Sequence, residues 1–582
     1  MQTRRRDFLK LAGTGAFAAG LAAPAQATAG ARSLETLFTE RGGTAGATPG
    51  SVDSEERRRL LAKAVFGRKD AVQGDGGMVV CAHPLATRAG TDALRAGGNA
   101  ADAALATSVT QCIVEPHMTG ITGVLGMLYY DAATGSIDYI SGGMNRPMAD
   151  LAGWGPASIA TGMGAAVPGF WAGFEKSREM HGTMSSKDLC AAAIAYARDG
   201  FEVHPFLWGE AFTMGHMIGI NDQGREIWYP EGALINPGEM VYQKRAADTL
   251  ERLAEEGNDY FYFGDFAREY CDVVQRAGGV MTPDDFARYD VRVDEPARGS
   301  YRGYDLVGSP APDHGGLHVI EIMQMLEFLD IARLGPVTES AELLWQMHRI
   351  AAQVFADGGR HRDPKYHDVP TDMIASKEYA KTRFELLQMD APLETGEMPP
   401  PGSCHVTAVD AAGNVATVLH SCMSLPWTNG LFVGGHTIVA SGAHFFRVMP
   451  GPGERATTYV APNMVLKNGK PVIASGSPSG SLLQNIVQNY TNMLDHGMDI
   501  ETSTNLPRFG NAYAPGGTMY PAVEVDFPEA TRNAANARGL DLGVVNQWNW
   551  GMGSFEAIHI DPDTGRRHAC GDARRNAMAE AV

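Results

Sequence analysis

Residues 399–419 read PPPGSCHVTAVDAAGNVATVL, and this stretch carries the clearest indication of the fold. A proline-rich segment ends in Gly402, and residues 405–410 then alternate between apolar and polar side chains, as a β-strand does. The pair Gly413-Asn414 is typical of a turn, and residues 415–420 form a second strand-like run. The stretch therefore predicts a β-hairpin that begins just after Gly402.

Ser403 stands at the start of this hairpin, directly after Gly402. A cut between the two residues would give Ser403 a free α-amino group beside its own hydroxyl. One residue would then supply both nucleophile and general base, as in N-terminal nucleophile hydrolases. A Gly-Ser pair before a strand is common, so the pattern by itself does not identify the chemistry.

The first 29 residues are predicted to be a twin-arginine signal peptide. Residues 4–10 read RRRDFLK, residues 11–23 are apolar, and small residues suited to signal peptidase follow at 25–29. The apolar run is too short for a permanent membrane span. We therefore expect export to the periplasm, and no membrane association of the mature protein.

Charge and cysteine content restrict the function further. The formal net charge is -19 with 20% charged residues, which argues against binding to nucleic acid or to an acidic membrane surface. The seven cysteines are scattered and form no C-x-x-C pair, so neither a disulfide framework nor a zinc site is expected, although single bridges remain open. The length fits one very large domain or two smaller ones.

Helical and strand patterns alternate along the rest of the chain. Residues 30–75 are interpreted as a loosely attached leader. Strands are predicted at 78–82, 125–130, 137–140, 431–433, 437–440, 463–467 and 471–474. Helices are predicted at 85–95 and 101–112, and helical patterns dominate 169–196, 244–256, 265–277 and 317–334. Strands at both ends with helices between them predict a layered α/β architecture whose sheets take strands from both halves.

Eight short stretches occur in a recognisable order along the chain. They are AGGNAADAA (96–104), VPG with AGF (167–174), ARDGF (197–201), YRGY (301–304), GGLH (315–318), SCHVTAVD with GN (403–414), GSPSGS (476–481) and PRF (507–509). Each is weak alone, but together they resemble the signatures of the gamma-glutamyltranspeptidase family of N-terminal nucleophile hydrolases. The resemblance covers about residues 78–582.

The resemblance implies a fold and a division of the chain. The fold would be α/β, of the α+β kind: a four-layer αββα sandwich. The precursor would cut itself into a large subunit, residues 30–402, and a small catalytic subunit, residues 403–582. The large and small subunits would stay together as partners.

The resemblance also implies catalytic residues. Ser403 falls on the nucleophile position, where the family usually has Thr, and Gly402-Ser403 would be the processing site. Ser421 matches a hydroxyl that assists the nucleophile, and the amides of Ser479 and Gly480 would form the oxyanion hole. Cys404 should point to the opposite face of the strand and have a structural role.

The expected substrate-binding residues depart from the family. The arginine that holds the glutamyl carboxylate is replaced by glycine in the block 141–147, and Arg146 lies a few residues away. The family's asparagine after the nucleophile strand is Met423, and its later Gln and Asp are absent from residues 440–446, where His444 and Phe445 stand instead. Thr458 falls where the family has a serine near the carboxylate, and the lid, residues 448–455, is short. A pocket of this kind is apolar and lacks a counter-ion for a zwitterion.

The sequence predicts an amide hydrolase or acylase that needs no cofactor and no metal, and acts on a small-molecule amide or peptide. Gamma-glutamyl transfer or glutathione hydrolysis, with Arg146 and His444 recruited to hold the glutamyl group, is the alternative. A non-processing periplasmic binding relative is a second alternative. The loop 361–368, HRDPKYHD, contains metal-ligand residue types without a fixed spacing and is expected to be a solvated loop.

Overall fold

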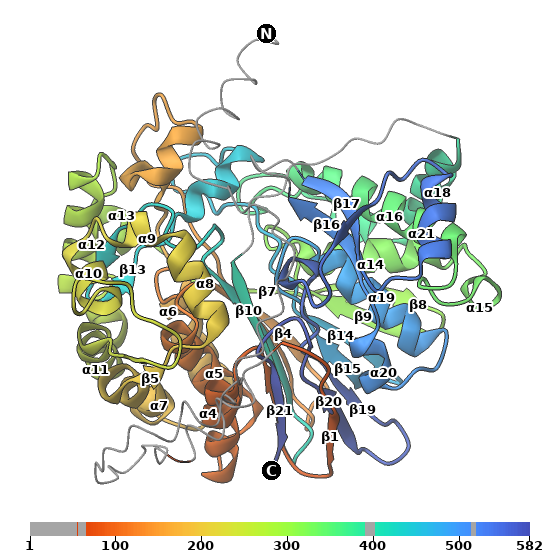
Figure 1. Cartoon of the computed structure of the whole chain (residues 1–582), viewed down its shortest axis with the longest axis horizontal. Helices are drawn as coiled ribbons and strands as arrows, with labels where there is room; N and C mark the ends of the chain where they lie inside the picture. The colour runs from red at the N-terminus through yellow and green to blue at the C-terminus, as the bar shows by residue number, and fades with distance from the viewer. Residues whose placement is uncertain (1–54, 56–65, 390–401, 514–518) are drawn as a thin grey trace, which may run out of the picture.

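The structure is a computed structural model that describes residues 55, 66–389, 402–513 and 519–582 (Figure 1). The predicted signal peptide, almost all of the segment 30–65 and prolines 399–401 lie outside the described residues.

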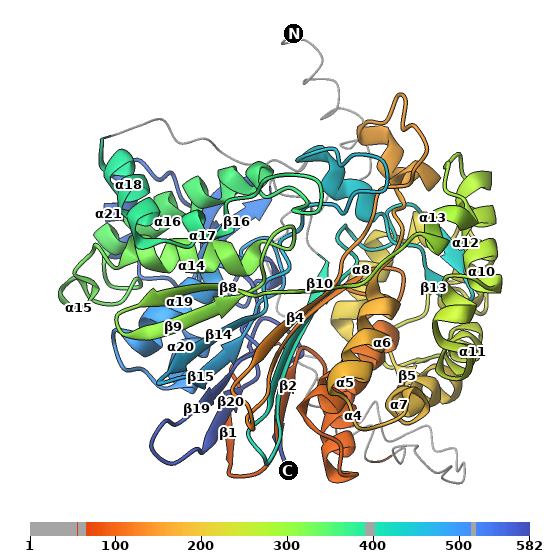
Figure 2. The ribbon, with the colours of Figure 1, turned by 180° about the vertical axis from the view of Figure 1, so that it is seen from behind.

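Two seven-stranded antiparallel sheets lie face to face in the middle of the molecule (Figures 1 and 2). The first, called the β10 sheet, has the spatial order β21 (Met578–Ala581), β2 (Met78–Cys81), β10 (Ser403–Val409), β11 (Val415–Ser421), β3 (Val124–Tyr130), β4 (Ile137–Gly142) and β7 (Arg292–Asp294). The second, called the β15 sheet, has the order β1 (Ala71–Gly74), β20 (Arg567–Cys570), β19 (Ile558–Ile560), β15 (Lys470–Ser475), β14 (Asn463–Lys467), β9 (Tyr304–Gly308) and β8 (Ala297–Tyr301).

Helices cover the outer face of each sheet, so the predicted four-layer αββα sandwich is confirmed (Figures 1 and 2). The helices on the β10 side are α4 (Pro84–Arg95), α5 (Ala100–Val114), α6 (Phe170–His181), α7 (Ser186–Asp199), α11 (Lys244–Phe261) and α12 (Asp265–Arg276). Those on the β15 side are α14 (Gly315–Leu326), α16 (Ala341–Ala356), α18 (Lys377–Gln388), α19 (Leu482–Leu494) and α20 (Ile500–Asn505).

Shorter elements connect these layers. The short helices are α8 (Pro205–Thr213), α9 (Gly215–Ile218), α10 (Asp222–Trp228), α13 (Pro283–Ala287), α15 (Ile331–Leu334), α17 (Thr371–Ile374) and α21 (Glu529–Asn536). The small sheets pair β5 (Phe201–Glu202) with β6 (Met240–Val241), β12 (Phe432–Val433) with β13 (His436–Thr437), and β16 (Phe509–Tyr513) with β17 (Met519–Glu524) and β18 (Gly543–Val545).

The period of two along each strand divides the core into layers. On β10, Val406 and Ala408 pack against the helices, whereas Val409 belongs to the cluster between the two sheets. That inter-sheet cluster also contains Met464 from β14 and Ile558 from β19. Helix α5 is buried along its whole length, and its Asn99-Asp102 capping box fixes its start.

Strands on both sides of Gly402 are interleaved in both sheets, as the sequence predicted. The β10 sheet, for example, places β10 and β11 between β2 and β3, although β2 lies more than 300 residues earlier in the chain. A cut after Gly402 would therefore leave two chains held together by ladder hydrogen bonds on both sides of the hairpin.

Some predicted boundaries were wrong. The helical pattern of residues 169–196 is two helices, α6 and α7, because Gly182 ends the first and Ser185 caps the second. The pattern of residues 317–334 likewise breaks into α14 and α15. The part of the expected leader at Ala71–Gly74 is instead β1, which pairs with β20 at the edge of the β15 sheet.

Candidate active site

Ser403 is the first residue of the central strand β10, and Ser421 is the last residue of its neighbour β11. The hairpin register places the two residues directly opposite each other. Ser403 is only partly buried, whereas the other residues of β10 are fully buried. The end of the hairpin therefore presents two adjacent hydroxyl groups, one of them accessible.

The hydroxyl of Ser421 links Ser403 to the predicted processing site. Its Oγ lies 2.7 Å from the Ser403 Oγ, and it donates a hydrogen bond to the carbonyl oxygen of Gly402. Since this donation uses the single Ser421 proton, the Ser403 hydroxyl is the donor in the pair of serines. The backbone N–H of Met423 also donates to Ser421 Oγ, at 2.8 Å, and holds it in place. The arrangement polarises the carbonyl that Ser403 would attack during self-cleavage.

Ser421→Ala is expected to slow cleavage between Gly402 and Ser403 by about a hundredfold or more, because the carbonyl loses its hydroxyl donor. The rate is measured as the appearance of the smaller chain on a denaturing gel. Ser424→Ala is the matched control, since that nearby buried hydroxyl bonds to the carbonyls of Cys422 and Leu425 and not to Gly402. Cleavage of the Ser421 variant at the unchanged rate would contradict this role.

The predicted oxyanion loop, residues 476–480, directly follows β15 and abuts the β10–β11 hairpin. A Cβ atom at Gly476 would lie 2.2 Å from the ring of His405, which shares its strand face with Ser403. Thr417 Oγ1 donates to the carbonyl of Ser475 at 3.2 Å. Ser479 has a positive φ of 92°, and no hydrogen bond from its N–H or that of Gly480 to another described residue is seen. Both amides therefore lack an acceptor among the described residues, and their role as an oxyanion hole stays a prediction.

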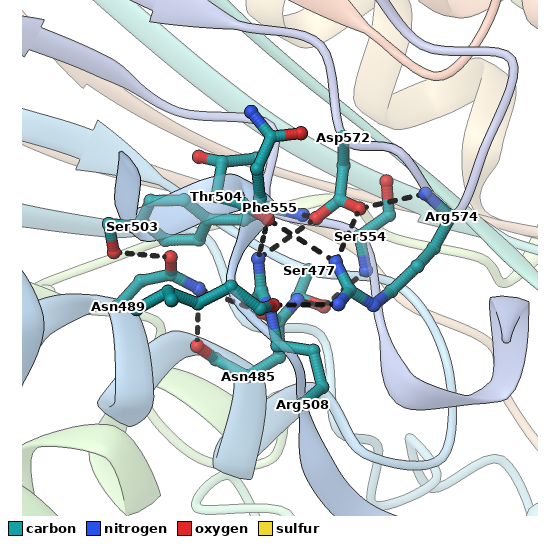
Figure 3. A network of polar contacts seen from close by, with 12 residues as sticks. Ser477, Asn485, Asn489, Ser503, Thr504, Arg508, Ser554, Phe555, Asp572 and Arg574 are labelled. Carbon is teal, nitrogen blue, oxygen red and sulfur yellow. Dashed lines mark hydrogen bonds and ion pairs between the residues drawn. The ribbon is translucent and has the colours of Figure 1, made fainter. Parts of the chain in front are cut away.

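A buried polar network supports this loop (Figure 3). Asn485 Nδ2 and the N–H of Ser554 donate to Ser477 Oγ at 2.8 and 3.2 Å. The network continues into a group of ion pairs in which Asp572 contacts both Arg508 and Arg574 at 3.2 Å. All three of those charged side chains are fully buried. The loop thus rests on a buried network of hydrogen bonds and ion pairs.

Cys404 points to the opposite face of β10, as predicted. Its fully buried thiol lies 3.3 Å from a carboxyl oxygen of Glu115, at the end of α5, and packs with Met118 and Phe206. Burial raises the pKa of the Cys404 thiol well above its ordinary value, so the reactive thiolate is disfavoured. All seven cysteines are free and buried.

Two of the predicted substrate-binding residues, Met423 and Phe445, meet in one apolar cluster beside the hairpin end. The cluster also contains Leu419 of β11 and, from other parts of the chain, Val124, Met144, Leu151, Ala166, Ala456 and Val460. Because the N–H of Met423 bonds to Ser421 Oγ, this cluster is continuous with the pair of hydroxyls. The apolar wall formed by this cluster is therefore linked to the predicted nucleophile through the Met423 backbone N–H and the Ser421 hydroxyl.

The other three predicted substrate-binding residues are engaged within the protein. Arg146 donates to the carbonyls of Pro450 and Ala149, at 2.7 and 3.4 Å, and so ties down the short lid. The Thr458 hydroxyl donates to buried Asp313 at 2.5 Å. His444 lies 3.2 Å from the carbonyl of Thr457, and burial lowers the pKa of His444 to about 3. His444 is therefore neutral at physiological pH and offers no positive charge.

Arg455 was missed by the sequence analysis. A Cβ at Gly143 would lie 2.8 Å from Arg455 Cδ, so this side chain fills the space beside the glycine of the block 141–147. Its guanidinium bonds to Ser141, to Asn145 and to the carbonyl of Asp290. The Arg455 guanidinium is therefore already bound by acceptors within the protein. No local motif marks Arg455, because its contacts come from a segment about 300 residues away.

The loop 361–368 is solvated in part: Pro364, Lys365, Tyr366 and Asp368 are exposed, and its other residues are buried or half-buried. Asp363 is buried and forms a two-pronged ion pair with Arg292 at 2.6 and 2.8 Å. His367 Nε2 contacts Glu454. Within the described ranges, no cluster of three or more His, Cys, Asp or Glu residues is placed to hold a metal ion. No helix in the described part of the chain is long and apolar enough to cross a membrane.

The sequence model of the family described as Gamma-glutamyltranspeptidase matches residues 86–582. The chain belongs to this family. It is therefore an amide hydrolase or acyltransferase of the N-terminal nucleophile type.

Relatives of two kinds are similar to this member of the gamma-glutamyltranspeptidase family. The Acylase ACY 1 proenzyme of Pseudomonas sp. (strain SE83) is 32% identical over 532 residues, which cover 85% of this chain and 92% of that protein. The Glutathione hydrolase proenzyme of Bacillus subtilis (strain 168) is 26% identical over 585 residues, covering 92% and 96%. Among solved structures, the cephalosporin acylase from Bacillus halodurans superposes with a TM-score of 0.78 at 24% identity, covering 89% of this chain and 97% of that one, which supports the fold.

Proposed function

We propose that this protein is a self-processing periplasmic acylase that cleaves an amide through an acyl-enzyme on Ser403 and prefers a neutral, apolar acyl group to a gamma-glutamyl group. The observation that carries the preference is the apolar cluster of Met423 and Phe445, which is continuous with the Ser403–Ser421 pair. The Tat-type sequence RRRDFLK supports export, and the proenzyme relatives support a precursor that is cut.

Self-cleavage would begin when Ser403 Oγ attacks the carbonyl carbon of Gly402. The C–N bond to Ser403 breaks as the C–O bond forms, which gives an ester and frees the α-amine. Water then hydrolyses the ester and leaves residues 403–582 with an N-terminal serine. Ser421 favours this step because its hydroxyl donates to the Gly402 carbonyl.

Turnover would use the hydroxyl of Ser403 and the α-amine that self-cleavage has freed. Ser403 Oγ passes its proton to its own α-amine and attacks the substrate carbonyl. The N–H groups of Ser479 and Gly480 stabilise the oxyanion, and the proton moves from the α-amine to the departing amine nitrogen. Water, or an acceptor amine, then releases the acyl group.

The gamma-glutamyl alternative is less well supported by the contacts around the site. A glutamyl group carries a carboxylate and an ammonium, and both need charged or amide partners when buried. Arg146 and Thr458 already have partners within the protein, and His444 is neutral. The glutathione hydrolase relatives keep this alternative in the test below.

A neutral arylacetyl p-nitroanilide is expected to be cleaved with a kcat/KM about a hundredfold higher, or more, than gamma-glutamyl p-nitroanilide, because Arg146, Thr458 and His444 offer the glutamyl charges no free partner. Met423→Asn is expected to reduce this ratio by about tenfold or more, since it places an amide in the apolar wall. Release of nitroaniline measures both rates.

Met389→Asn is the control, because Met389 is an exposed methionine away from this cluster. A preference for the gamma-glutamyl substrate in the unmodified enzyme would overturn the acyl-group assignment and establish the alternative. A chain that is never cut and cleaves neither substrate would favour the second alternative, a non-processing periplasmic binding protein.

A further inference from the structure

Arg575 is a fully buried arginine beside the first residue of β10. Its Nη2 donates to the carbonyl oxygen of Ser403 at 3.0 Å. The ladder between β2 and β10 stops at the pair Cys81–Val406, and three further steps in this register would set Pro84 beside Ser403. Pro84 begins α4 and has no N–H to give. The Arg575 guanidinium therefore supplies the hydrogen bond that the neighbouring strand cannot supply.

The charge on Arg575 is not neutralised by an ion pair. Among the described residues, none of its nitrogens lies within ion-pair distance of a carboxylate, and its buried Nε and Nη1 have no hydrogen-bond partner. Two aromatic rings hold the guanidinium instead: its Cζ lies 5.2 Å from the ring centre of Phe206 and 5.9 Å from that of Trp550. Asp572, on the same loop, is occupied by Arg508 and Arg574.

The titratable groups around Arg575 are shifted toward their neutral forms. Burial raises the pKa values of the surrounding carboxyl and thiol groups and lowers those of the imidazoles, so each shift favours the neutral form. Seven such groups in the ranges that the structure describes interact with the guanidinium. Glu115 and His117 follow α5, His204 and Glu210 belong to the N-cap and body of α8, Cys404 lies on β10, Cys422 follows β11, and Glu556 precedes β19. The guanidinium is thus the dominant charge next to Ser403.

We propose that Arg575 is a positioning residue that holds the Ser403 backbone and, through its unpaired positive charge, keeps the Ser403 α-amine unprotonated at neutral pH. This inference rests on the proposed function, in which that amine takes the Oγ proton. A free α-amine ordinarily has a pKa of about 7.7–8.0, at which most of it would be protonated at pH 7. A like charge within about 4–6 Å lowers such a pKa by about one to three pH units. Arg575, bonded to the same residue's carbonyl, provides that charge before any substrate binds.

The test is the pH dependence of kcat/KM, which reports ionisations of the free enzyme. Arg575→Gln keeps a donor for the Ser403 carbonyl and removes the charge. The acid limb of its profile of kcat/KM against pH is expected to move upward by about one to two pH units, because the α-amine is then protonated at higher pH. Arg575→Lys keeps the charge and is expected to hold the limb near its original position. Arg566→Gln, an exposed arginine of the same C-terminal region paired with Asp75, is the control and should leave the limb unchanged.

A measurement on the unmodified enzyme covers the case in which Arg575→Gln does not fold. Competitive acetylation of the Ser403 amine as a function of pH, read by mass spectrometry of the smaller chain, gives the amine pKa directly. A value clearly below about 7.7 supports the proposal, and a value at or above it overturns the proposal.

A Gln variant that loses rate equally at all pH values, with its limb unmoved, would also overturn it and leave Arg575 a purely structural role. These outcomes are separate from failure of the proposed function. If the proposed function is wrong, the unmodified chain stays uncut, or Ser403→Ala retains activity, whatever residue stands at 575.

Discussion

Ser403→Ala is expected to leave the chain uncut and to lower amide hydrolysis by at least about ten-thousandfold, because the variant lacks the hydroxyl for both self-cleavage and acyl transfer. The Ser403 Oγ sits 2.7 Å from Ser421 Oγ, which in turn bonds to the Gly402 carbonyl, so removing it empties the reacting position and leaves the surrounding fold intact. A denaturing gel with intact mass should show one chain in the variant and two in the original protein. The smaller of the two should begin at Ser403.

Two variants make this result specific. Cys404→Ala changes the adjacent residue, whose thiol lies on the opposite face against Glu115, and it is expected to be cut and active. Ser403→Thr keeps the hydroxyl and is expected to be cut. Cleavage after Gly402 in the alanine variant would show that another group breaks this bond and would remove Ser403 from the mechanism.

Asp572→Asn is expected to lower the free energy of unfolding by about 3–5 kcal/mol, which in a chain of this size corresponds to a fall in Tm of about 3–5 °C. The carboxylate is fully buried and contacts both Arg508 and Arg574, so its neutralisation leaves buried positive charge without compensation (Figure 3). Burial and the neighbouring Arg574 lower the pKa of Arg508 to about 10 even with Asp572 in place, so loss of that carboxylate would disfavour the charged guanidinium further. Glu524 continues to pair with Arg574, so the loss falls mainly on Arg508.

The measurement is best made in the Ser403→Ala background, where a single uncut chain simplifies thermal unfolding. Asp75→Asn removes the partner of Arg566 from an exposed ion pair and should leave Tm unchanged within error. Because Asp572 also accepts from the N–H of Phe555, beside the residue that bonds to Ser477, the same variant is expected to loosen the 476–480 loop. A Tm for Asp572→Asn equal to that of the background protein would contradict the role of the buried pairs.

The two strands of the β10–β11 hairpin are close in sequence, and part of the candidate site could therefore be predicted. The turn between Val409 and Val415 fixes the register, and this register alone brings Ser403 opposite Ser421. The period of two then sends Cys404 to the other face, where the structure has it. The hairpin and the side of β10 on which Cys404 lies depend only on local backbone geometry, which is why both were predicted from the residues, whereas Ser421 was predicted from the family resemblance.

The sequence by itself determined the family, the hairpin that follows Gly402, and the apolar character of Met423 and Phe445. Only the tertiary structure decided which charges remain free near Ser403. Arg455 fills the space beside Gly143, and Arg146 is bound to the Pro450 carbonyl in the predicted lid, whereas Arg575 reaches the Ser403 carbonyl from the C-terminal region. The physical reason is that a hairpin register follows from neighbours a few residues apart, whereas the partner of a buried charge depends on segments hundreds of residues away that meet only when the two sheets pack.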